Sequence, residues 1–103
     1  MTRAAPVVMT RRSGRTVCDV PAIAGWEGVE KLWKYLEFHF AAVCVSKADG
    51  PDARRWTVRV LGATLEIHHE DPWGNMIVSC SPEYDGILAS IAEDLRRRLG
   101  ALS

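Results

Sequence analysis

The chain lacks the features that place a protein in a membrane or in a disulfide framework. No stretch of its 103 residues approaches the roughly 20 consecutive apolar residues that a membrane-spanning helix needs. The N-terminus also lacks the apolar core of a signal peptide. Three widely spaced cysteines, Cys18, Cys44 and Cys80, are an odd number and favour reduced thiols over a disulfide framework. We therefore expect a cytoplasmic protein.

Net charge is lacking as well. Thirteen basic and thirteen acidic residues cancel, so the whole chain exerts no long-range attraction on nucleic acid or on an anionic membrane. Arginine outnumbers lysine by ten to three, and this bias, with abundant alanine, is typical of a high-GC bacterial genome.

The N-terminal segment is the one local exception to this neutrality. Its four charged residues are all basic, namely Arg3, Arg11, Arg12 and Arg15. We expect residues 1–15 to form a basic, flexible arm and residues 16–103 to form a single α+β domain. Alternatively, Val7, Val8 and Met9 form a short edge strand that turns at Ser13 and Gly14.

Recognisable catalytic motifs are missing too. The sequence has no Gly-x-Ser-x-Gly elbow, no phosphate-binding glycine loop, no dinucleotide fingerprint and no Cys-x-x-Cys or His-x-x-x-His spacing. We expect no enzymatic activity, no cofactor and no metal. The alternative is a small enzyme that uses His69 and Cys80, although a thiol on an apolar strand face is normally inert because burial disfavours the thiolate.

Two segments have the periodicity of amphipathic helices. In residues 26–39 the apolar side chains recur at steps of three and four, and the spacing predicts a helix. In residues 81–99 a Ser-Pro-Glu start, an apolar face that includes Leu88, Ile91 and Leu95, and a following Gly100 predict a second helix.

The middle of the chain predicts a meander of three antiparallel strands. A two-residue turn at Gly62 and Ala63 sets Trp56 opposite His69 and Arg55 opposite Glu70, with an apolar face and a charged face. A four-residue loop at 71–74 then sets Glu70 opposite Asn75 and adds Met76, Val78 and Cys80 to the apolar face. The whole predicts a two-layer α+β sandwich of order βαβββα, in which a short N-terminal strand joins the meander and both helices lie on one face.

The segment "IHHEDPWGN" (67–75) is the predicted site. Its two histidines point to opposite faces of one strand, so they cannot bind the same metal ion. Trp73 at the hairpin tip predicts an anchor for a protein partner or for a second copy in a homodimer. The polar rim of this surface is predicted to be Arg55, His68, Glu70 and Asn75.

The section from 26 to 99 resembles the layout of the double-stranded-RNA-binding domain. Its order of helix, three strands and helix is similar to that family, and "GPDARRWTVRV" (50–60) is similar to the loop that leads into the family's second strand. The resemblance implies binding of duplex RNA, with a contact set of Arg11, Arg12, Arg15, Arg54 and Arg55 as the alternative site.

Overall fold

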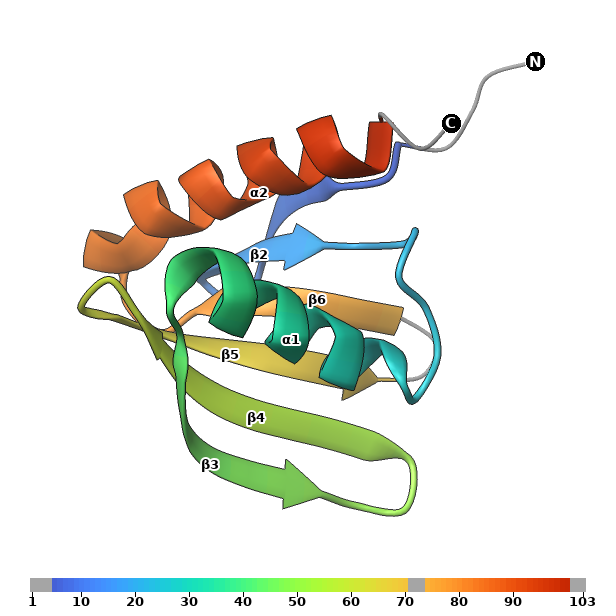
Figure 1. The fold of residues 1–103 in the computed structure, drawn as a ribbon. Helices are drawn as coiled ribbons and strands as arrows, with labels where there is room; N and C mark the ends of the chain where they lie inside the picture. Colours follow the sequence, from blue (N-terminus) through green and yellow to red (C-terminus); the bar gives the residue numbers. More distant parts are fainter. Residues whose placement is uncertain (1–4, 71–73, 101–103) are drawn as a thin grey trace.

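The computed structural model describes residues 5–70 and 74–100 and confirms an α+β fold (Figure 1). Its elements, in chain order, are β1 (Val8–Arg12), β2 (Arg15–Asp19), α1 (Gly28–Phe40), β3 (Val43–Asp49), β4 (Ala53–Val60), β5 (Ala63–Glu70), β6 (Gly74–Ser79), a short 3-10 turn (Pro82–Tyr84) and α2 (Asp85–Gly100).

The described strands form one antiparallel sheet in the order β1-β2-β6-β5-β4-β3. It has six strands where four were predicted, because β1 and β3 are added at its two edges. β1 pairs with β2 across a turn in which Ser13 and Gly14 both have positive φ. Residues 8–12 therefore follow the edge-strand alternative. Residues 41–48 are small and β-branched and lead into a turn composition, which predicts a strand, and β3 confirms it, although the predicted order of elements leaves this strand out.

Both helices pack against the same face of this sheet. α1 lies over β4 and β5, whereas α2 lies over β1, β2 and β6 (Figure 1). Leu32 and Leu36 from α1 and Leu88 and Ile91 from α2 are fully buried in one core with the strand residues of that face. We call this the helix face, and the opposite side the outer face.

The hairpin of β4 and β5 turns one residue earlier than predicted. Leu61 and Gly62 form the turn, both with positive φ, and Val60 pairs with Ala63. The predicted pairing is therefore wrong by two positions, so Trp56 faces Ile67 and Arg55 faces His68. A shift of two leaves every side chain on its predicted face, because strand side chains alternate with a period of two.

The hairpin of β5 and β6 differs from the prediction in a way that matters more. Glu70 pairs with Gly74, and Ile67 pairs with Ile77. This is a slip of one residue, which exchanges the two faces of β6. Ile77 lies on the helix face in the core, while Met76 and Val78 point to the outer face, contrary to the prediction.

The same slip turns Asn75 inward, where it holds the connection between β2 and α1. Its side-chain nitrogen donates to the carbonyl oxygens of Ile23 and Gly25 at 2.8 and 2.9 Å, and its side-chain oxygen lies 2.7 Å from His69 Nδ1. Gly28, the first residue of α1, packs directly on this amide. The buried amide thus fixes where α1 begins on the sheet.

We predict that Gly28→Ala lowers the free energy of unfolding by about 2–3 kcal/mol. A Cβ at this position would lie 2.0 Å from Asn75 Nδ2 and 2.9 Å from the Ile23 carbonyl oxygen, and the three hydrogen bonds of Asn75 prevent it from moving away. Urea denaturation measures the loss. Gly86→Ala in α2 is the matched control, since a Cβ there meets nothing within 4 Å. Equal stability of the two variants would contradict this packing.

Candidate functional site

An apolar strip lies at the centre of the outer face. Val17 on β2 and Met76 and Val78 on β6 point away from the helices because they alternate with Cys18 and Ile77. Each of the three is 3% exposed, and they form a cluster separate from the main core. We call this cluster the outer apolar strip. Neither helix covers it, so its burial comes from side chains of the sheet itself.

Two arginines of the β1–β2 hairpin reach over the outer apolar strip. Arg12 donates to both carboxylate oxygens of Asp19, at 2.6 and 3.1 Å, and lies 3.2 Å from Met76 Sδ. Arg15 donates from Nε to the Ser79 carbonyl oxygen at 3.0 Å and from Nη2 to Glu66 Oε1 at 3.1 Å. Arginine stems cover apolar surface while their charged ends stay paired. The two side chains therefore form a charged cover on the strip.

His68 lies beside this cover, between two glutamates of its own strand. Its Nε2 lies 2.9 Å from Glu66 Oε1, and its Nδ1 lies 3.6 Å from Glu70 Oε1. The structure places His68 on the outer face, as the alternation predicts, but its side chain is buried among its neighbours. It is thus part of the wall of the site rather than an exposed contact.

Glu66 connects the arginine cover to His68. Its pKa is lowered from the ordinary value of 4.5. Burial is the largest single influence and would raise the pKa, but the hydrogen bonds and charges of His68 and Arg15 together outweigh it. The carboxylate is therefore held in its ionised form at the edge of the outer apolar strip.

A hollow of about 420 Å³ opens over the strip. Its floor is the outer apolar strip, and its polar walls are Arg12, Arg15, Arg55, His68 and Glu70. An apolar floor with a few converging polar groups is typical of binding sites, whose volumes are roughly 300–1,000 Å³. A second hollow, of about 450 Å³, adjoins it across Arg55 and Glu70, which line both.

The predicted partner-binding residues fall into three groups. Arg55, His68 and Glu70 border the same hollow, and no ion pair or side-chain hydrogen bond joins the exposed Arg55 to another described residue. Asn75 is buried on the helix face with its amide fully engaged, so it does not belong to the rim. Trp73 lies outside the described residues.

The five arginines of the nucleic-acid alternative do not form one surface. Arg12, Arg15 and Arg55 border the outer hollow, whereas Arg11 extends from β1 toward α2, 3.8 Å from Asp85. Arg54 is buried on the helix face.

Arg54 is held between two tryptophans. Its guanidinium lies 4.7 Å from the ring centres of both Trp26 and Trp56, and it donates to both carboxylate oxygens of Asp49 and to the Trp26 carbonyl oxygen. A guanidinium held in this way stabilises the junction of α1 with β3 and β4 and offers little to a phosphate.

Cys80 and His69, the residues of the enzymatic alternative, lie apart. Cys80 follows β6 and is exposed, in contrast to its predicted place on the apolar face. His69 faces Asn75 four residues from the end of β6, and its ring packs against Trp26 in a T-shaped arrangement. Burial, followed by the charge of Glu66, raises the pKa of the Cys80 thiol even though Arg15 lies 3.4 Å from its Sγ. This arrangement does not activate the thiol.

Comparison with known proteins finds no match among family models, curated proteins or solved structures. Between α1 and α2 the described residues form four strands, where the double-stranded-RNA-binding layout has three. Within residues 5–70 and 74–100, no helix is long and apolar enough to cross a membrane, and no group of three or more His, Cys, Asp or Glu side chains could hold a metal ion.

The sequence interpretation missed the residues that form the floor and cover of the site. Val17, Met76 and Val78 are ordinary core residues by type, and only the parity of the β5–β6 pairing assigns β6 to one face or the other. The glycine at position 74 was a usable signal for where the loop ends, because glycine readily adopts positive φ, and Gly74 has a φ of +85° in the structure. A glycine at the end of a hairpin loop can begin the paired strand, and here it does.

We predict that Arg15→Gln raises the pKa of the Glu66 carboxyl, measured by NMR titration. The folded pKa of Glu66 is below 4.5, so the carboxylate stabilises the fold above pH 4.5 and loses this effect as the pH falls through its folded pKa. The difference in stability between wild type and variant should therefore shrink in acid. An unchanged Glu66 titration would contradict the pairing with Arg15.

Proposed function

We propose that this protein is a non-enzymatic interaction module that binds a protein partner through its outer face. The observation that carries the proposal is the apolar strip under a hollow on the uncovered side of the sheet. A purely solvated face of an antiparallel sheet needs only polar side chains. Three apolar side chains at its centre therefore favour a binding role for this face.

The composition of the outer face also supports a protein partner. Protein interfaces combine an apolar centre with a polar rim, and arginine is enriched in them. Here the outer apolar strip is the centre, while Arg12, Arg15, Arg55 and Glu70 are the rim. Arg12 and Arg15 form ion pairs with Asp19 and Glu66, so their positive charges are balanced within the rim. Such a rim suits a partner surface of mixed charge better than a polyanion.

Arg55 is the residue that we expect to contact the partner most directly. It is exposed, lines both hollows and has no ion pair with a described residue. Its guanidinium can therefore donate hydrogen bonds to a carboxylate of a partner without breaking an internal bond.

The free state of Cys18, Cys44 and Cys80 supports a reducing compartment, and we propose that the bacterial cytoplasm is the location.

We predict that Arg55→Glu weakens partner binding about tenfold, equivalent to about 1.4 kcal/mol. The immobilised wild-type protein captures partners from a lysate of its source cells, and mass spectrometry identifies what it retains. The affinity of the purified partner is then measured for each variant. Lys31→Glu on α1 is the matched control, because it is exposed and changes the net charge equally.

The outcome of this comparison decides the proposal. Loss of binding in Arg55→Glu with full binding in Lys31→Glu supports the outer face as the interface. Equal affinity of both variants for the partner would refute it. Capture that disappears after ribonuclease treatment would also refute it, and would favour the RNA alternative.

A further inference from the structure

The ring of His68 faces a carboxylate with each of its two nitrogens. Nε2 lies 2.9 Å from Glu66 Oε1, and Nδ1 lies 3.6 Å from Glu70 Oε1. A neutral imidazole has one N–H group, so it donates toward one of these carboxylates and presents a lone pair to the other. The imidazolium has two N–H groups and can face both carboxylates favourably. The arrangement is therefore the one that protonated His68 favours.

The two carboxylates are not held equally. Glu66 accepts a hydrogen bond from Arg15 on the same oxygen that contacts His68, and its side chain is 16% exposed. Its lowered pKa keeps it ionised throughout the range in which an imidazole titrates, near an ordinary pKa of about 6.5. Glu70 has the longer contact, and its side chain is 44% exposed. Loss of the proton from His68 therefore leaves Glu66 in place and releases Glu70.

Arg55 is the cation that Glu70 can reach next. Arg55 pairs directly with His68 across β4 and β5, and Glu70 follows His68 by two residues on the same face. Diagonal neighbours of this kind lie within reach of long side chains. Arg55 and Glu70 line both hollows, and no ion pair joins Arg55 to another described residue. His68 and Arg55 therefore compete for one carboxylate.

The other groups around His68 already have strong partners or carry no charge. Arg15 binds Glu66, as described above. Arg12 binds both carboxylate oxygens of Asp19, and the charge of Glu70 raises the pKa of Arg12 less than Asp19 does. On β6, the residue opposite His68 is Met76. Arg55 is thus the cation of this site that gains most from a released Glu70.

We propose that His68 is a proton switch that controls whether Arg55 is open to a partner. Protonated His68 holds Glu70, and Arg55 remains open. When His68 loses its proton, Glu70 pairs with Arg55 and occupies its guanidinium. The role of this switch rests on the proposed function, because Arg55 is the residue that we expect to contact the partner.

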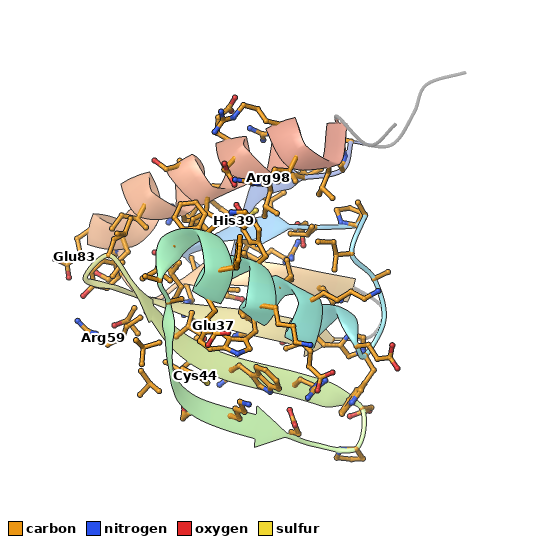
Figure 2. The ribbon with its side chains drawn as sticks, viewed as in Figure 1. Glu37, His39, Cys44, Arg59, Glu83 and Arg98 are labelled. Atoms are coloured by element: carbon orange, nitrogen blue, oxygen red, sulfur yellow. The ribbon has the colours of Figure 1, made fainter. Side chains whose placement is uncertain are left out.

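Hydrogen exchange at Arg55, followed by NMR in the protein alone, tests the switch. A guanidinium that binds a carboxylate exchanges its protons more slowly. Arg59, an exposed arginine of the same strand (Figure 2), is the internal reference that removes the direct effect of pH on exchange. The exchange rate of Arg55 relative to Arg59 should fall about threefold as His68 loses its proton, which is typical of an exposed ion pair. A constant ratio across the His68 titration would overturn the proposal.

Three variants show whether the effect passes from His68 through Glu70. Glu70→Gln removes the carboxylate and should leave the ratio constant, and His68→Gln removes the titrating group and should do the same. His39→Gln should keep the wild-type fall. It is the matched control, because His39 is exposed on α1, on the helix face (Figure 2).

The variants also give the results that would contradict the switch. A fall that persists in Glu70→Gln or in His68→Gln would overturn the proposal, and so would its loss in His39→Gln. Glu70 is partly exposed, so its variant stays informative even if the buried His68→Gln does not fold. No partner takes part in these measurements. Failure of the switch therefore leaves the proposed function standing, and failure of partner capture leaves the switch standing.

Discussion

The pairing register of β5 and β6 is the constraint on which the rest of the structure depends. Because strand side chains alternate, this register decides which half of β6 enters the core. Ile77 is buried under the helices, and Asn75 binds the backbone of Ile23 and Gly25 ahead of α1. Gly28 can then begin α1 directly on that amide. One pairing thus positions the first helix, its preceding connection and the core.

The same register creates the candidate site. It turns Met76 and Val78 outward beside Val17, and an apolar strip on an uncovered face needs protection from water. Arg12 and Arg15 supply it with their stems, and their charges are paired with Asp19 and Glu66. Both pairs are partly buried, so a partner that displaced the arginines would have to offer new hydrogen bonds to Asp19 and Glu66.

Much of the fold could be predicted from the sequence, but the site could not. The recurrence of apolar residues every three to four positions located both helices. The alternation in β4 and β5 assigned their side chains to the correct faces, because a pairing register that is wrong by two positions leaves each side chain on the same face. The predicted register of the β5–β6 hairpin was wrong by one position, which exchanged the two faces of β6. Backbone geometry at Gly74 sets this register, and hydrophobicity does not reveal it. Asn75 and Arg54 were predicted at the surface because polar residues usually lie there, yet each is buried with its hydrogen bonds satisfied inside the protein.

The most direct test of this account is the pattern of backbone NOEs between β5 and β6 in solution. The account predicts contacts between opposite residues in the pairs Leu65 with Ser79, Ile67 with Ile77 and His69 with Asn75. Contacts of Leu65 with Cys80, Ile67 with Val78 and His69 with Met76 would contradict it. Met76 and Val78 would then belong to the core, and the outer face would have no apolar strip.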